Sequence, residues 1–227
     1  MNIAIIPARS GSKRIKNKNL INFFGKPLIY YSINLAKKSG LFDKIIVSTD
    51  SKEIKKISQN YGAEVPFMRP KSISGDKTKA QDVVAHCIKY LKKEKIKFKY
   101  VCCIYPTAPL MQINDLKKGF KKIQLKLNYV FSACKFDKSI LRSFTLKKDK
   151  TIQFIKPNLI NKNSQDLDTT FFDAGQFYWG TKKSWLKKNL YLSKGSIIEI
   201  NPKYVQDVDY YKDLLVLKNK FKKIKKK

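Results

Sequence analysis

Histidine, arginine and acidic residues are all scarce in this chain. Of its 227 residues one is a histidine, 17 are Asp or Glu, and only four of the 49 Lys and Arg residues are arginines. The single histidine, His86, has no partner pattern around it, so a Ser-His-Asp mechanism is not indicated. We therefore take His86 to be structural.

Cysteine is too sparse and too irregularly spaced for a common metal site. The four cysteines form no C-x-x-C pair, which excludes the usual structural zinc spacings. Cys102 and Cys103 lie inside the apolar run at residues 100–105, where free cysteines behave as small core residues. The pattern predicts a protein whose cysteines stay reduced.

Long apolar runs are also missing. None approaches the roughly 20 residues that a membrane span needs. The N-terminal run is too short for a signal-peptide core, because Pro7 ends it. These features predict a cytoplasmic protein with no membrane partner. A length of 227 residues with 43% hydrophobic content fits one domain, residues 1–227, with a real core.

The net charge of +32 raises the question of a nucleic-acid partner. Arginine, which is best suited to bidentate phosphate and base contacts, is scarce, and the lysines are scattered along nearly every segment. We interpret most lysines as a solvated surface and expect no specific nucleic-acid partner; a basic nucleic-acid-binding protein stays an alternative. The densest run, residues 218–227, is expected to fray from the body.

The first nineteen residues organise the rest of the chain. An apolar run at residues 2–6 breaks into a loop with Gly11, two serines and five cations, which predicts a buried strand that delivers a loop at its carboxyl end. In open α/β sheets ligands bind at that edge. Gly and Ser let backbone amides approach an anion and the cations neutralise it, so the loop suits a polyphosphate. An ordinary surface turn is the alternative.

Apolar periodicity predicts alternating strands and helices through most of the chain. Such alternation indicates βαβ units and an α/β fold with a mostly parallel, doubly wound sheet. The expected strands are residues 2–6, 44–48, 63–67, 100–104, 129–134, 173–180 and 197–200. The expected helices are residues 28–39, 52–60, 80–92, 113–124, 182–188 and 210–220.

The alternation breaks between about Asp137 and Asp173. Two short alternating runs, residues 144–146 and 152–154, flank a polar turn at 147–150, which predicts a β-hairpin outside the main sheet. Nearly forty residues without a βα unit are too many for an ordinary connection, so we predict an inserted arm at about 137–173. An exposed hairpin edge often pairs with a partner subunit; a lid folded on its own domain is the alternative.

Two aspartates near the C-terminus could hold a metal ion. Asp207 and Asp209 stand two apart in an extended stretch, so their side chains can point to the same side. Mg²⁺ prefers one or two carboxylates together with substrate phosphates. Beside the cationic loop the pair suggests nucleotidyl transfer, although a D-x-D before a helix is also a common helix-start cap.

Several motifs together resemble the sugar-acid cytidylyltransferases, the CMP-sialic acid synthetase family. The opening motif is IPARSGSKRIKNKN at residues 6–19. Later motifs follow in the family's order: VSTD at 47–50, RP at 69–70, PTAP at 106–109 and VQDVD at 205–209. The resemblance covers nearly the whole chain. Further runs, such as DAGQFYWG at 173–180, are most similar to the pseudaminic acid branch of the family.

The resemblance implies a Rossmann-like nucleotidyltransferase fold, a homodimer built through the arm, and Mg²⁺-dependent transfer of CMP from CTP to a nine-carbon 2-keto sugar acid. By matching motifs, the expected catalytic residues are Arg9, Lys18, Asp207 and Asp209, with the two aspartates as metal ligands. The expected nucleotide-binding residues are Ala8, Arg9, Ser10, Gly11, Ser12, Lys13, Lys18, Asn19 and Arg69. The expected sugar-binding residues are Tyr105, Gln165 and Asp173.

Three positions depart from the family's pattern. Ser10 replaces a more usual glycine, and its side chain is small enough for the loop to keep its shape. Tyr105 stands where sialic acid enzymes carry a glutamine, and Ser164 stands where they carry an arginine that meets the sugar carboxylate. The last two favour pseudaminic acid as the substrate, with legionaminic acid, N-acetylneuraminic acid or Kdo as alternatives.

Overall fold

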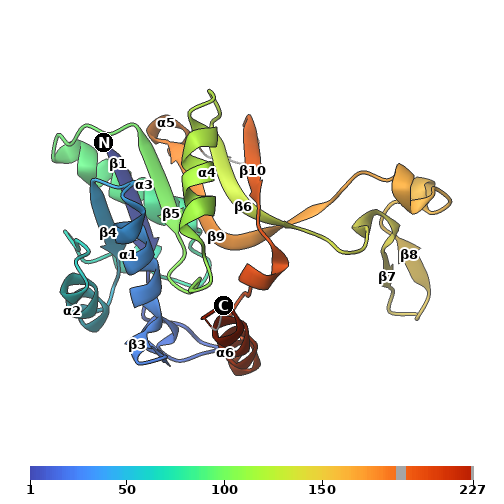
Figure 1. Ribbon diagram of the computed structural model, residues 1–227, viewed down its shortest axis with the longest axis horizontal. Helices are drawn as coiled ribbons and strands as arrows, with labels where there is room; N and C mark the ends of the chain where they lie inside the picture. Colours follow the sequence, from blue (N-terminus) through green and yellow to red (C-terminus); the bar gives the residue numbers. More distant parts are fainter. Residues whose placement is uncertain (188–192, 226–227) are drawn as a thin grey trace.

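The computed structural model describes residues 1–187 and 193–225 (Figure 1). Its helices are α1 (Leu28–Ser39), α2 (Lys52–Asn60), α3 (Ala80–Lys93), α4 (Ile113–Ile123), α5 (Lys182–Trp185) and α6 (Tyr211–Lys225). Its strands are β1 (Asn2–Pro7), β2 (Asn22–Phe23), β3 (Lys26–Pro27), β4 (Lys44–Ser48), β5 (Tyr100–Ile104), β6 (Tyr129–Lys135), β7 (Phe144–Leu146), β8 (Ile152–Phe154), β9 (Phe171–Thr181) and β10 (Gly195–Glu199). No helix in these ranges is long and apolar enough to cross a membrane.

A six-stranded sheet in the order β10-β6-β9-β5-β1-β4 forms the body of the protein. β1 pairs in parallel with β4 and β5, and β10 pairs in parallel with β6. β9 is antiparallel to both of its neighbours, β5 and β6. The predicted α/β fold with a mostly parallel sheet is therefore confirmed, with one antiparallel strand inserted near its middle.

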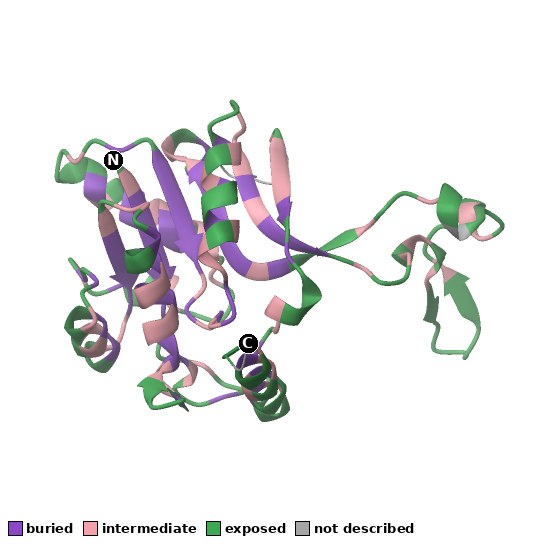
Figure 2. Ribbon diagram, in the orientation of Figure 1, coloured by how far each residue is buried: buried purple, intermediate pink, exposed green. Residues whose placement is uncertain are grey.

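The sheet is buried on both faces, which explains the unbroken apolar runs in its strands. In β1, Ala4 and Ile6 face the layer that contains α1 and α4, whereas Ile3 and Ile5 face the layer that contains α3 and α5. Figure 2 shows the resulting buried centre between exposed helix surfaces. Helices on both faces are the arrangement expected of a doubly wound sheet.

The order of the strands fixes where a ligand can enter. From β1 the chain runs through α1 to β4 on one side, and it later returns through α3 to β5 on the other side of β1. Such a switch in strand order opens a crevice at the carboxyl ends of the two central strands. The loops that follow β1 and β5 border this crevice.

Two local predictions were wrong. Residues 63–67 form no regular strand and make only isolated bridges, Ile46 to Glu64 and Thr49 to Met68, because Pro66 lacks the N–H that a ladder needs. The basic C-terminal run does not fray through residue 225, since α6 packs Leu217 and Phe221 into an apolar cluster with Phe23. The helix expected at 182–188 ends earlier, since α5 stops at Trp185. Residue 188 and residues 226–227 lie outside the described residues.

The arm projects from the body at the end opposite β4 (Figure 1). β7 and β8 pair in antiparallel register, so the hairpin predicted around residues 147–150 is present. Phe144, Leu146, Ile152 and Ile155 are all more than half exposed on it. β9 already begins at Phe171, so the end of the predicted arm overlaps the main sheet.

Candidate active site

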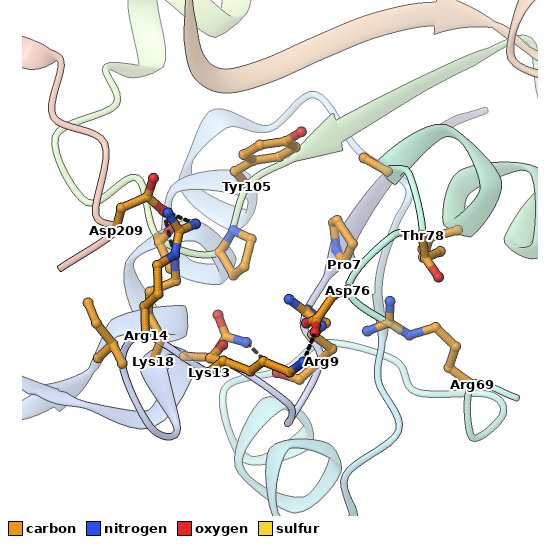
Figure 3. Close-up of a pocket in the computed structure, with 17 residues that line it drawn as sticks. Pro7, Arg9, Lys13, Arg14, Lys18, Arg69, Asp76, Thr78, Tyr105 and Asp209 are labelled. Carbon is orange, nitrogen blue, oxygen red and sulfur yellow. Dashed lines mark hydrogen bonds and ion pairs between the residues drawn. The ribbon is translucent and has the colours of Figure 1, made fainter. Parts of the chain in front are cut away.

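A cavity of about 340 Å³ lies at the crevice between the ends of β1 and β5 (Figure 3). Its walls come from the loop after β1, the segment before α3, the loop after β5 and the stretch before α6. The lining residues are Pro7, Arg9, Ser12, Lys13, Arg14, Ile15, Lys18, Asn19, Arg69, Asp76, Thr78, Ala80, Val83, Tyr105, Pro106, Thr107 and Asp209.

Two buried aliphatic residues join the loop after β1 to the stretch before α6. Ile15 and Val208 are almost fully buried in one apolar cluster, and burial of each such side chain contributes about 1.5–3 kcal/mol. Their chain neighbours then meet in the cavity: the Arg14 guanidinium lies 2.7 Å from the Asp209 carboxylate. Lys18 Nζ donates a hydrogen bond of 2.6 Å to the Val208 carbonyl.

The other half of the loop is held by polar contacts. Asn19, which is buried, donates from its side-chain amide to the Arg9 carbonyl at 2.9 Å. Both the backbone N–H and the hydroxyl of Ser10 donate to the Asp50 carboxylate, at 2.8 and 3.0 Å. Asp76 accepts from Arg9 at 2.5 Å and lies 2.7 Å from Lys13 Nζ. The loop is thus pinned from several segments of the chain.

Burial lowers the pKa of two cations in the cavity, Lys18 and Arg69. The pKa of Lys18 is lowered chiefly by burial, against the opposing effect of Asp209 and Asp207. Burial likewise lowers the pKa of Arg69. Arg69 donates from Nη2 to the Ser48 carbonyl at 3.1 Å, while its buried Nε has no hydrogen-bond partner among the described residues. Orphaned buried donors of this kind are rare.

The arrangement suits a polyanion together with a divalent cation. Cationic side chains converge on one cavity from separate segments (Figure 3). Such side chains hold phosphate groups through charge-assisted hydrogen bonds. The carboxylate of Asp209 lies in the same cavity, and Mg²⁺ prefers carboxylates and phosphate oxygens as ligands. The converging cations are Arg9, Lys13, Arg14, Lys18 and Arg69.

The cavity unites most of the nucleotide-binding residues expected from the sequence. Arg9, Ser12, Lys13, Lys18, Asn19 and Arg69 line it, together with Tyr105, expected at the sugar, and Asp209, expected at the metal. Three other loop residues do not: Ala8 is buried and its N–H bonds to the Ser48 carbonyl, Ser10 holds Asp50, and Gly11 has space around it for a side chain. These three shape the loop rather than the cavity wall.

Asp207 and Asp209 do not share a cavity, contrary to what their spacing suggested. Asp207 lines a neighbouring hollow of about 360 Å³ together with Asp173. The turn of the chain at the buried Val208 separates them, although both aspartates still act electrostatically on Lys18. Asp173 itself accepts hydrogen bonds from the Tyr178 hydroxyl at 2.7 and 2.6 Å.

Gln165 is not brought to the cavity of its own chain. It is exposed in a short 3₁₀ turn, Ser164–Asp166, within the projecting arm (Figure 1). The arm leads this turn away from the crevice, and Gln165 is not among the cavity residues. A role for Gln165 at the sugar would therefore require a second subunit.

Sequence reasoning missed two charged residues that the structure places in the cavity. Arg14 stands in the recognised loop, but its partner Asp209 lies at the far end of the chain. Asp76 follows a Ser-Gly pair in the segment between Arg69 and α3, where no motif points to it. The one signal for Asp76 was that acidic residues are scarce in this basic chain and that Asp76 lies near a family motif.

Comparison with known proteins agrees with this geometry. A family model described as cytidylyltransferase matches residues 3–211. Pseudaminic acid cytidylyltransferase of Campylobacter jejuni subsp. jejuni serotype O:23/36 is 40% identical over 94% of this chain and 93% of its own length. A Helicobacter pylori protein named pseudaminic acid cytidylyltransferase and UDP-2,4-diacetamido-2,4,6-trideoxy-beta-L-altropyranose hydrolase is 38% identical over 92% of this chain and 40% of its own length.

A solved structure shares the fold. CMP:2-keto-3-deoxy-manno-octonic acid synthetase complexed with CTP superposes with a TM-score of 0.72 at 15% identity, over 98% of each chain. The α/β sheet and its cation-lined crevice define a nucleotidyltransferase. With the family match, the chain belongs to the cytidylyltransferase family.

Proposed function

We propose that this protein transfers CMP from CTP to pseudaminic acid, giving CMP-pseudaminic acid and pyrophosphate. The observation that carries the proposal is the convergence of five cations on one cavity at the ends of β1 and β5. The similarity to pseudaminic acid cytidylyltransferase over nearly the full length of both chains supports the choice of substrate.

In this proposal the loop after β1 holds the triphosphate of CTP. Arg9, Lys13 and Lys18 provide charge-assisted hydrogen bonds to the phosphate oxygens, with Ser12 and Asn19 in support. Arg69 contacts the cytidine, because Arg69 lines the same cavity.

The carboxylates next to this loop fit a magnesium ion. Asp209 lies in the cavity, and Asp207 is close enough to act on Lys18. Both donors are hard oxygens, as Mg²⁺ requires, and CTP supplies phosphate oxygens beside them. Asp209 would hold the ion from the cavity, and Asp207, which lines the neighbouring hollow, would join it only by turning its side chain past Val208. When bound, the ion would offset negative charge on the phosphates. Arg14 holds the Asp209 carboxylate at the cavity through an ion pair of 2.7 Å.

The reaction joins the anomeric oxygen of the sugar to the α-phosphorus of CTP. As that O–P bond forms, the bond from the α-phosphorus to the bridging oxygen breaks and pyrophosphate leaves with the electron pair. The hydroxyl proton is released from the sugar. Arg9, Lys13 and Lys18 stabilise the charge that grows on the leaving pyrophosphate, which is where preorganised cations lower the barrier most.

The sugar acid binds between the cavity and the neighbouring hollow. Tyr105 lines the cavity, and its ring lies 5.2 Å from that of Tyr178. The Tyr178 hydroxyl in turn holds Asp173, which lines the hollow. Tyr178 itself is buried and links Tyr105 to Asp173 from behind the surface. The Tyr105 ring suits the methyl and acylamino groups of pseudaminic acid better than a polyhydroxyl tail.

The active enzyme is a homodimer that pairs through the arm. The β7–β8 hairpin stands alone, and an isolated two-stranded hairpin is at best marginally stable in water. Its exposed apolar side chains, Phe144, Leu146 and Ile152, offer a surface for a second copy. In that dimer each arm can bring its Gln165 to the sugar site of the partner.

Two smaller assignments complete the proposal. We place the enzyme in the cytoplasm, because its four cysteines are free and buried, as in a reducing compartment. We assign the lysine excess to the solvated surface rather than to a nucleic-acid partner. If the protein bound nucleic acid tightly at physiological salt and released no pyrophosphate from CTP and sugar, it would be a nucleic-acid-binding protein instead of a cytidylyltransferase.

The test is pyrophosphate release from CTP, Mg²⁺ and pseudaminic acid, with mass analysis of the product. We expect a CMP-sugar in equal amount to pyrophosphate, and no release when the sugar acid is left out. The variant Arg9→Gln should release pyrophosphate much more slowly than the wild-type enzyme, because Arg9 lines the cavity. Absence of pyrophosphate with every keto sugar acid tried would contradict the proposal.

A further inference from the structure

Asp76 occupies the position where the proposed function places an anion of the substrate. Each of its two carboxylate oxygens forms an ion pair with a different cation of the loop after β1. Oδ1 lies 2.5 Å from Arg9 Nη1, and Oδ2 lies 2.7 Å from Lys13 Nζ. Figure 3 shows the carboxylate bridging these two side chains inside the cavity. A carboxylate held by two cations has the contacts that a phosphate oxygen pair would make.

The carboxylate stays charged but is poorly anchored otherwise. The pKa of Asp76 is lowered first by the hydrogen bond from Lys13 and then by that from Arg9, so it is ionised at neutral pH. Its side chain is 40% exposed, and that of Lys13 is 82% exposed. Ion pairs with this much solvent contact are weak, so a triphosphate of higher charge can displace the carboxylate.

The segment that carries Asp76 lies outside the core, and none of residues 71–80 is buried. Asp76 lies between the short 3₁₀ turn Lys71–Ile73 and the start of α3 at Ala80, each held by its own hydrogen bonds. Gly75, next to Asp76, has no atom near where a side chain would project. By contrast, Asp50 bonds to both the backbone and the hydroxyl of Ser10 outside the cavity, which makes Asp50 a fixed support.

We propose that Asp76 is an internal competitor for the triphosphate. Its carboxylate fills the site between Arg9 and Lys13 until CTP displaces it, and the carboxylate returns to that site as pyrophosphate leaves. This inference rests on the proposed function, because it assigns those two cations to CTP. Two like charges cannot share these cations cheaply, so carboxylate and phosphate exclude each other. The exchange weakens CTP binding slightly and speeds the release of pyrophosphate.

The test measures binding of three probes, CTP, inorganic pyrophosphate and cytidine, by calorimetry with Asp76→Asn. We expect the dissociation constants of CTP and pyrophosphate to fall by about 3- to 10-fold, the scale of a screened ion pair. Cytidine carries no phosphate, so its affinity should not change. In turnover assays pyrophosphate should inhibit the variant more strongly than the wild-type enzyme.

The control is Glu53→Gln, which removes one negative charge from the exposed first turn of α2, outside the cavity lining. Glu53→Gln should leave all three affinities unchanged. If it also tightened binding of CTP and pyrophosphate, the effect of Asp76→Asn would reflect the net charge of the protein. Equal or weaker binding of CTP and pyrophosphate by Asp76→Asn would overturn the inference. Wild-type protein that binds no CTP would instead contradict the proposed function, and with it this inference.

Discussion

Replacement of Asp209 by asparagine is the sharpest test of the metal assignment. The change keeps the size of the side chain and removes one charge from the cavity wall. Asp209 is 35% exposed, and its contacts are ion pairs to Arg14 at 2.7 Å and Lys18 at 4.0 Å. Partly solvated pairs contribute little to folding, so thermal stability should hardly change. Loss of a preorganised charge at a reacting phosphate should lower kcat by on the order of 10²-fold or more.

The assay is pyrophosphate release at saturating CTP and sugar acid over a range of Mg²⁺ concentrations. Asp209→Asn should show a low kcat and require more Mg²⁺, while Asp207→Asn tests whether the second aspartate also holds the ion. Chelation of the metal should stop turnover of the wild-type enzyme, and added Mg²⁺ should restore it. The melting temperature of each variant is measured alongside.

A charge-matched control separates this effect from a general loss of acidity. Glu199 is exposed at the end of β10 and lies outside the cavity lining, so Glu199→Gln should keep the wild-type rate. Near-wild-type kcat in both Asp207→Asn and Asp209→Asn at saturating Mg²⁺ would refute the metal assignment. A large fall in melting temperature would show that Asp209 is structural instead.

Two further predictions concern assembly and the core. Removal of the β7–β8 turn at residues 147–150 should weaken the dimer in sedimentation experiments; wild-type protein that is monomeric at micromolar concentration would rule out the arm as the dimer contact. Gly119→Ala should destabilise the fold by about 1–3 kcal/mol through overpacking, because the new methyl would lie 2.8 Å from Trp179 and 2.9 Å from Phe177. An unchanged urea midpoint would show that α4 can shift to make room.

Strands that are buried on both faces could be predicted from local sequence alone. β4 and β5 have the expected bounds, because a short unbroken apolar run between polar ends is typical of a strand that is buried on both faces. The place of β9 between β5 and β6 could not be read in the same way. Which strands become neighbours depends on contacts between distant segments, and the apolar pattern of β9 fits either direction.

The C-terminal run shows how charge can hide an apolar pattern. Its many lysines suggested a frayed tail, yet Leu214, Leu217 and Phe221 recur at the i, i+3, i+7 spacing of a helix face. These side chains pack against the loop after β1 through Ile15. α6 thereby helps to hold the cavity wall, which the density of lysines alone could not show.

Arg9, Lys13 and Lys18 of the candidate site were predictable, because they stand together in one loop. Their carboxylate partners were harder to find, since folding brings them from elsewhere in the chain. Lys18 and Val208 are hydrogen-bonded across 190 positions of sequence, and Asp76 reaches Arg9 across 67. No local pattern records such pairs, and they follow only from the packing of Ile15 against Val208 and the path of the chain before α3.

The measurement that tests the central claim most directly is kcat/KM for pseudaminic acid and for N-acetylneuraminic acid under the same conditions. A site lined by the aromatic ring of Tyr105 should leave hydroxyls of the sialic acid tail unpaired, at about 1–3 kcal/mol each. We predict a preference for pseudaminic acid of roughly 10²-fold or more. Comparable efficiency with both sugars, or a preference for N-acetylneuraminic acid, would contradict the account.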